Sequence, residues 1–237
     1  MSKEQWLCWM DGIHDPYFNM AMDEVLLANS ALQQNQVLVR VYRWDRPSVS
    51  FGSAQIMPEE LADKYTLVRR PTGGGVVYHD VDLTYTVVVP PEHKIMQLDR
   101  MESYKIFHEA LLIKMQEDGV EALLESHGTD HVDRSTMQCF VSPSRFDLVA
   151  PSGSKYAGAA QRRTRCGILH QGSIKLEAAG GDWDKLCAEL LESLKIKFDI
   201  EFQDWQPAQE VLLHAEELGQ IKYSTEAWNR HHEFEAK

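Results

Sequence analysis

Apolar residues recur at a 3.6-residue period in several stretches of the chain, which predicts amphipathic helices. The predicted helices comprise residues 17–34, residues 101–117, residues 182–195 and a helix with Pro207 in its first turn. Asp15 and Pro16 form a start signal for the first helix, Gly119 a stop for the second and Asp182 an N-terminal cap for the third. Each apolar stripe is interpreted as a face that is buried against the core.

Short runs rich in Val, Thr, Tyr and Phe are bounded by turn residues, and these runs predict β-strands. The predicted strands comprise residues 37–42, 47–52, 66–69, 76–78 and 84–89. Residues 146–150 and 154–161 flank the turn Pro151-Ser152-Gly153 and predict a hairpin. The mixture of elements predicts an α+β fold, in which a mixed, largely antiparallel sheet is flanked by helices.

Neither a repeat, a low-complexity linker nor a break in composition divides the 237 residues. We therefore expect a single domain over residues 1–237, with its core at about 34–225 and no separate C-terminal accessory domain. The chain has no apolar run near the roughly 20 residues that a spanning helix needs and no apolar N-terminal signal region, so a cytoplasmic protein without membrane contact is predicted. The four cysteines are far apart and indicate neither disulfides nor a metal site.

The formal net charge of −12 argues against general nucleic-acid binding, which depends on cationic side chains. Arginines nevertheless gather in two places, Arg69 with Arg70 and Arg162 with Arg163 and Arg165. Such basic islands on an acidic protein could receive an acidic partner or a phosphorylated group. For any single arginine, solvated surface charge is the simpler interpretation.

The segment most suggestive of a ligand site is Arg69-Arg70-Pro71-Thr72-Gly73-Gly74-Gly75-Val76-Val77-Tyr78-His79-Asp80. Glycines let main-chain N–H groups approach a ligand closely, and the neighbouring arginines supply fixed charge. The spacing fits neither a P-loop nor a dinucleotide fingerprint. Three glycines alone would be interpreted as a hairpin turn between the strands at 66–69 and 76–78, but the flanking basic and titratable residues favour a site.

A second candidate site combines Cys139 with Lys155. Seven residues separate Cys139 from Phe146, and at about 3.3 Å per residue this loop could bring the thiol to the hairpin end that carries Lys155. A nearby ammonium would favour the thiolate and so produce a nucleophile for an acyl group. Taken alone, the cysteine is more often a buried apolar residue and the lysine a surface residue.

Three segments in order resemble the signature segments of the lipoate/octanoate transferase and ligase family. These are the glycine segment above, Lys155-Tyr156-Ala157-Gly158-Ala159-Ala160-Gln161 and Gly167-Ile168-Leu169-His170-Gln171-Gly172-Ser173-Ile174. The resemblance covers most of the chain and extends to Asn19-Met20-Ala21-Met22-Asp23-Glu24, a helix common in such proteins. It implies a biotin/lipoate ligase-like catalytic domain that holds an octanoyl or lipoyl group in a tunnel.

Within that family, Cys139-Phe140, Pro143-Ser144 and Asp147-Leu148 are similar to the cysteine-dependent octanoyltransferases. The resemblance implies that Cys139 is the nucleophile and that Lys155 activates it and contacts the acyl carbonyl. The implied substrate-binding residues are Arg70, Gly73, Gly74, Gly75, Tyr78, His79, Gly158, Ala160, His170 and Gly172. His79 could pair with Asp80 to order the loop, which we favour, or take a proton from the incoming amine.

The implied donor is octanoyl-acyl carrier protein. The implied acceptor is a lysine of a lipoyl domain, in a 2-oxoacid dehydrogenase complex or the glycine cleavage H protein. No cofactor is needed, because exchange between thioesters is nearly balanced in energy and amide formation is favourable. The basic islands at Arg69, Arg70, Arg162, Arg163 and Arg165 are candidate docking groups for an acidic carrier.

Three alternatives stay open. A lipoate-protein ligase would use ATP and Mg²⁺ to activate a free acid, although ligases often carry a further C-terminal domain and need no cysteine at the Cys139 position. An amidotransferase would use the same cysteine with another lipoyl-domain protein as donor. The third alternative is an inactive homologue that only binds acylated domains. It is supported by Gln171, which stands where the family pattern leads us to expect histidine.

Overall fold

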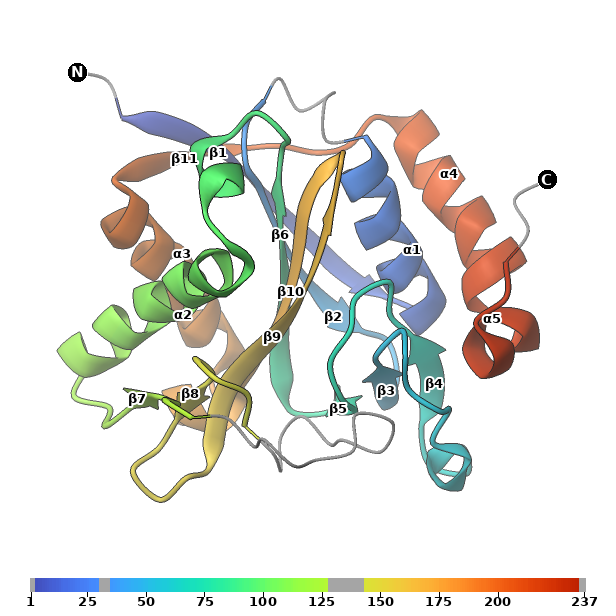
Figure 1. Cartoon of the computed structure of the whole chain (residues 1–237), viewed down its shortest axis with the longest axis horizontal. Helices are drawn as coiled ribbons and strands as arrows, with labels where there is room; N and C mark the ends of the chain where they lie inside the picture. The colour runs from blue at the N-terminus through green and yellow to red at the C-terminus, as the bar shows by residue number, and fades with distance from the viewer. Residues whose placement is uncertain (1–2, 30–34, 128–142, 235–237) are drawn as a thin grey trace.

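The computed structural model describes residues 3–29, 35–127 and 143–234. Within these residues the main sheet has eight strands in the order β11-β1-β2-β6-β10-β9-β8-β7 (Figure 1). From one edge to the other they are β11 (Ile200–Asp204), β1 (Glu4–His14), β2 (Leu38–Trp44), β6 (Asp82–Val89), β10 (Gly167–Lys175), β9 (Lys155–Thr164), β8 (Leu148–Val149) and β7 (Leu123–Leu124). β1 is parallel to β2 and β11, and the other pairs are antiparallel, which confirms the predicted mixed, largely antiparallel sheet.

Helices cover both faces of this sheet (Figure 1). One face packs against α2 (Arg100–Glu117) and α3 (Trp183–Phe198), and the other against α1 (Pro16–Ala28) and α4 (Gln209–Leu218). Alternate residues of a strand point to opposite faces, so β6 sends one set of side chains to each layer. Leu83, Tyr85, Val87 and Val89 join the α2 and α3 core, whereas Val88 joins the core under α1.

A small second sheet lies beside α1 at the lower right of Figure 1. It has the order β4-β3-β5, with β4 (Thr66–Arg69), β3 (Ser48–Phe51) and β5 (Val77–Tyr78). β3 pairs with β4 in parallel and with β5 antiparallel, so β4 and β5 do not pair with each other. The hairpin interpretation of the glycine segment is therefore wrong, and residues 70–76 form a connection across the middle strand.

The predicted helix starts are confirmed where a cap supports them. The Asp15 side chain accepts N–H bonds at the start of α1, with Pro16 in the first turn, and Asp182 caps α3. The helix α1 ends at Ala28 instead of residue 34, and Pro207 precedes α4 instead of lying in its first turn. The remaining helical segments are Glu59–Leu61, Lys94–Gln97, Leu176–Ala179, Gly219–Tyr223 and α5 (Glu226–His231).

No helix within the described ranges is both long and apolar enough to cross a membrane.

A buried arginine joins the sheet to α1. Arg40 of β2 is fully buried, and its guanidinium donates to Asp11 of β1 and to Asp23 of α1, each over 2.7 Å. The same group donates to the Asn19 side chain over 2.9 Å. Charges removed from water are stable only when paired in this way, so helix α1 has one docking position.

We predict that Arg40→Met destabilises the protein by about 3–5 kcal/mol, because Asp11 and Asp23 would stay buried without their cation. Urea unfolding followed by circular dichroism measures this change. Arg46→Met is the matched control, since Arg46 forms an exposed pair with its neighbour Asp45 and should contribute about 1 kcal/mol or less. Equal stability of the two variants would contradict the anchoring role of Arg40.

Candidate active site

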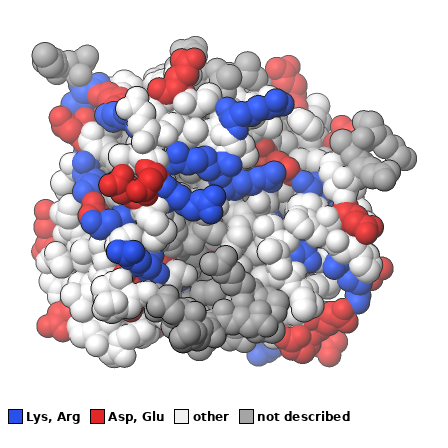
Figure 2. Space-filling model, in the orientation of Figure 1, with Lys and Arg blue, Asp and Glu red and all other residues white. Residues whose placement is uncertain are grey.

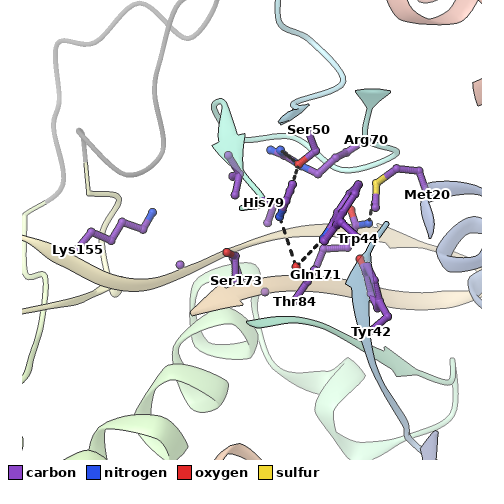
Figure 3. Close-up of a pocket in the computed structure, with 15 residues that line it drawn as sticks. Met20, Tyr42, Trp44, Ser50, Arg70, His79, Thr84, Lys155, Gln171 and Ser173 are labelled. Carbon is purple, nitrogen blue, oxygen red and sulfur yellow. Dashed lines mark hydrogen bonds between the residues drawn. The ribbon is translucent and has the colours of Figure 1, made fainter. Parts of the chain in front are cut away.

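A pocket lies where the small sheet meets the large sheet (Figure 3). It encloses about 440 Å³ that protein atoms do not fill, part of it open to solvent. Its lining comes from both sheets and α1 and comprises Met20, Tyr42, Trp44, Ser50, Arg70, Val77, His79, Thr84, Lys155, Gly158, Ala159, Ala160, Gln171, Gly172 and Ser173. Lys155 and Met20 lie at opposite ends in Figure 3, and Tyr42 and Trp44 make the Met20 end apolar. A lining with an ammonium at one end and aromatic side chains at the other suits a ligand that has both a polar group and an apolar part.

A buried ion pair holds Lys155 in place. Its Nζ lies 2.7 Å from Asp147 Oδ2, and the two side chains are 3% and 0% exposed. The Tyr104 hydroxyl donates to Asp147 Oδ1 over 2.5 Å, and the Ser144 N–H donates to Asp147 Oδ2 over 2.6 Å. With these partners the carboxylate has one arrangement, so the ammonium of Lys155 has a fixed position at the pocket. Sequence reasoning found Lys155 but not the roles of Asp147 and Tyr104, whose proximity arises from the pairing of distant segments.

Two of the predicted glycines, Gly158 and Gly172, leave room for a neighbouring side chain that any larger residue would displace. A Cβ on Gly158 would lie 2.2 Å from Lys155 Cε and 2.3 Å from its Nζ, so only glycine admits this lysine conformation. A Cβ on Gly172 would lie 2.2 Å from the Tyr85 ring. Both positions line the pocket together with Ala160, and their substrate-binding role stays a prediction.

The Arg70 side chain holds the glycine loop by hydrogen bonds to its carbonyl oxygens. Its guanidinium donates to the carbonyl oxygens of Gly73 and Gly75, each over 2.8 Å, and to Ser50 Oγ over 2.9 Å. Gly74 has a φ of +87°, which glycine adopts without strain. The three glycines are absent from the pocket lining, so their contribution is the path of the loop, whereas Arg70, Val77 and His79 of the same segment line the pocket.

Arg69 has a structural role that the sequence did not indicate. It is 2% exposed, and its guanidinium donates to carbonyl oxygens of residues 52, 53, 55, 228 and 229. The expectation that Arg69 and Arg70 form a docking island is therefore wrong, because both side chains are buried within the protein. The arginines at 162, 163 and 165 are exposed.

His79 lines the pocket within a hydrogen-bonded chain. Its Nδ1 lies 2.8 Å from Asp82 Oδ2 and its Nε2 lies 2.7 Å from Ser50 Oγ, while the Trp44 ring stacks on the imidazole at 4.0 Å. The predicted ordering role fits this geometry, but the carboxylate partner is Asp82 and not Asp80. Tyr78 does not line the pocket, since its ring packs against Tyr65 on the small sheet.

Gln171 connects the pocket to the buried arginine network. Its amide nitrogen donates to Asp23 Oδ2 over 2.7 Å, and its carbonyl oxygen accepts from Thr72 Oγ1 over 2.6 Å. The residue that departs from the family pattern thus links α1 to the glycine loop. Its neighbour His170 lies on the other face of β10, in the core beside Phe107, so the structure does not bring His170 into the site.

Cys139 lies outside the described residues. Among those described, no group of three His, Cys, Asp or Glu side chains is arranged to hold a metal ion. The described thiols Cys8 and Cys187 are buried, and burial raises the pKa of each to about 11, which disfavours the nucleophilic thiolate.

Comparison with known proteins agrees with this geometry. Residues 15–197 match the family described as the lipoyl protein ligase A/B catalytic domain. The chain belongs to this family. The octanoyltransferase LipM of Bacillus anthracis is 29% identical over an alignment 280 residues long. This alignment covers 97% of this chain and 99% of the relative. That of Bacillus subtilis is 37% identical over 197 residues, which cover 78% of this chain and 69% of the relative. The chain is accordingly an acyltransferase-type enzyme.

Solved structures of the family share the fold. Lipoate-protein ligase A bound with ATP superposes with a TM-score of 0.77 at 21% identity, covering 97% of this chain and 99% of that one. A bipartite lipoate protein ligase from Thermoplasma acidophilum superposes with a TM-score of 0.75 at 19% identity, covering 98% and 99%. These likenesses confirm the predicted ligase-like fold.

The buried histidines predict a pH dependence of stability. Burial, together with the positive charge of Lys155, lowers the pKa of His108 to about 3, and burial lowers the pKa of His170 as well. The unfolded chain takes up protons on both rings below about pH 6.5, whereas the folded core does not, so the free energy of unfolding falls as the pH falls. We expect His108→Phe to flatten this decrease between about pH 7 and pH 5 in urea titrations. His214→Phe, at an exposed position, should leave the slope unchanged; an unchanged slope in both variants would refute the prediction.

The close contact between Gly158 and Lys155 predicts an effect on the rate of the reaction. Gly158→Ala should displace Lys155 from Asp147 and lower the rate of acyl transfer about 100-fold, because small misplacements of catalytic groups are costly. A Lys155→Met background separates this cause from general damage. There the alanine should add little, since the two changes act through one side chain. Additive losses in the double variant would show that Gly158 acts elsewhere.

Proposed function

We propose that this enzyme transfers an octanoyl group from acyl carrier protein to a lysine of a lipoyl domain, through a thioester on Cys139. The curated relatives are named octanoyltransferases, which supports the acyl group and its use in protein lipoylation. The pocket supports it physically, with an apolar end at Met20 and a fixed ammonium at the other end. Lipoyl domains of 2-oxoacid dehydrogenase complexes or the glycine cleavage H protein are the proposed acceptors.

The observation that carries the cysteine assignment is the shared carboxylate of Asp147. Asp147 binds Lys155 on one oxygen and also accepts the Ser144 N–H, so the chain leaving Ser144 starts beside the pocket lysine. Cys139 precedes Ser144 by five positions, a tether of at most about 18 Å. This reach allows the thiol to approach an acyl carbonyl bound near Lys155.

The chemistry then proceeds by two displacements. The Cys139 thiolate attacks the donor thioester, the new C–S bond forms, and the donor sulfur leaves and takes up a proton. The neutral amine of the acceptor lysine next attacks the acyl-enzyme, the C–N bond forms, and the Cys139 sulfur leaves while the amine loses a proton. The fixed ammonium of Lys155 would stabilise the negative charge that develops on the carbonyl oxygen in both steps. No ATP is consumed, because each thioester carries its own activation.

Intact mass spectrometry after mixing with octanoyl-acyl carrier protein tests the proposal. We expect one octanoyl adduct that hydroxylamine removes and that is absent from Cys139→Ala. Cys166→Ala is the matched control, because Cys166 is the described thiol that is not fully buried and its loss should leave the adduct in place.

Two outcomes would overturn the assignment. An adduct that persists in Cys139→Ala would move the acylated nucleophile to another residue. Absence of any adduct, combined with lipoyl-domain acylation that requires free lipoate, ATP and Mg²⁺, would identify a ligase.

A further inference from the structure

A basic groove runs along the surface next to the pocket. It is lined by Ser53, Pro71, Gly73, Arg100, Gln161, Arg162, Arg163, Lys222, Trp228, His232 and Phe234 and encloses about 1160 Å³ that is partly open to solvent. In Figure 2 lysine and arginine side chains gather in a band across the middle of this face. The groove therefore collects cations on a chain whose formal net charge is −12.

The charges in this groove are only partly balanced. Among the residues that the structure describes, its lining contains four Lys or Arg side chains and no Asp or Glu. Glu24 lies behind it, 2.6 Å from Lys222 and 3.8 Å from Arg162, and offsets one of these charges. Arg163 is held by the carbonyl oxygens of residues 96 and 98. Arg100 and Arg162 remain exposed, so the groove presents a positive potential to an incoming molecule.

The groove continues the pocket along one strand and one loop. On β9, residues 155 and 158–160 line the pocket, and residues 161–163 line the groove. After β4, Arg70 belongs to the pocket lining, whereas Pro71 and Gly73 belong to the groove. Arg162 follows Lys155 by seven positions along the strand, which corresponds to roughly 23 Å. An extended arm anchored at Arg162 thus has a path along β9 towards Lys155.

We propose that this groove binds the phosphodiester of the donor's prosthetic arm, with the acyl end of the arm directed along β9 into the pocket. The inference rests on the proposed function and names the recognition element for its donor. A carrier-bound acyl thioester hangs on an arm attached through an anionic phosphodiester, which arginine binds with charge-assisted hydrogen bonds. The acceptor is a lysine, and its ammonium would be repelled by the same groove. Charge therefore selects the donor over the acceptor as occupant.

The rate at which the enzyme is acylated by donors with and without a phosphodiester tests the inference. We expect Arg100→Gln/Arg162→Gln to raise KM for octanoyl-acyl carrier protein about tenfold, as the loss of a charge-assisted contact predicts, with little change in kcat. Loading from octanoyl-pantetheine, which has no phosphodiester, should be unaffected. Arg165→Gln is the matched control, because Arg165 is exposed in the turn that follows β9 but does not line the groove. Equal slowing with both donors, or no slowing with either, would overturn the proposal.

Direct binding separates this inference from the proposed function, since it needs no turnover. Calorimetry on Cys139→Ala compares the carrier with its arm and the carrier whose serine lacks the arm. The arm should tighten binding, and Arg100→Gln/Arg162→Gln should remove that gain. Equal weakening of the binding of both carriers would place recognition on the surface of the carrier protein instead of its arm. Slower transfer from preloaded enzyme to the lipoyl domain, with loading intact, would assign the groove to the acceptor. If octanoyl-acyl carrier protein fails to acylate the wild-type enzyme while arm-dependent binding persists, the groove assignment stands and the thioester mechanism fails.

Discussion

The rest of the site depends on the burial of one guanidinium. Arg40 is removed from water on β2 and requires the carboxylates of both β1 and α1 to remain there. Asp23 also accepts hydrogen bonds from Tyr42, Thr86 and Gln171, so the charge pair extends into the pocket wall. A change in the docking of α1 would leave several polar groups buried without partners, and the pocket is correspondingly rigid.

From Gln171 the same network reaches the glycine loop. Gln171 accepts from Thr72, and Arg70 ties the loop carbonyls to Ser50 of the small sheet. The loop between β4 and β5 is thereby attached to both sheets. This attachment explains how a glycine-rich segment, which has high conformational entropy when unfolded, takes a defined path beside the pocket.

The sequence predicted those elements that local patterns specify. Capped helices such as α1 and α3 began where their caps lie, and runs such as β6 were found because β-branched residues are bounded by turns. The strand β1 was missed: its run of buried residues at 6–9 has no alternation, as is usual for a strand with parallel neighbours on both sides. Pairing of β3 between β4 and β5 is also non-local, so the adjacent segments resembled a hairpin.

A site residue could be predicted only where the sequence also indicated which face of its strand it occupies and which residue it contacts. His170 was chosen by its place in a motif, although alternation along β10 assigns it to the core and assigns Gln171 to the pocket. Asp147 carries no local signal of its ion pair with Lys155, because the β8 and β9 pairing that aligns them includes a register shift.

Pocket and groove differ in how their charges are compensated, and this difference suits a two-step transfer. In the pocket, the Lys155 ammonium is paired with the Asp147 carboxylate, so the acceptor amine would meet a cation that already has an anionic partner. In the groove, the described carboxylate behind the cations is Glu24, which lies near both Lys222 and Arg162. An anionic donor arm would thus gain attraction along the groove, whereas an acceptor lysine gains none there and would reach the acyl-enzyme after the donor arm has left. One acyl pocket can then serve both half-reactions, because the two partners are distinguished by the sign of the charge that they carry to it.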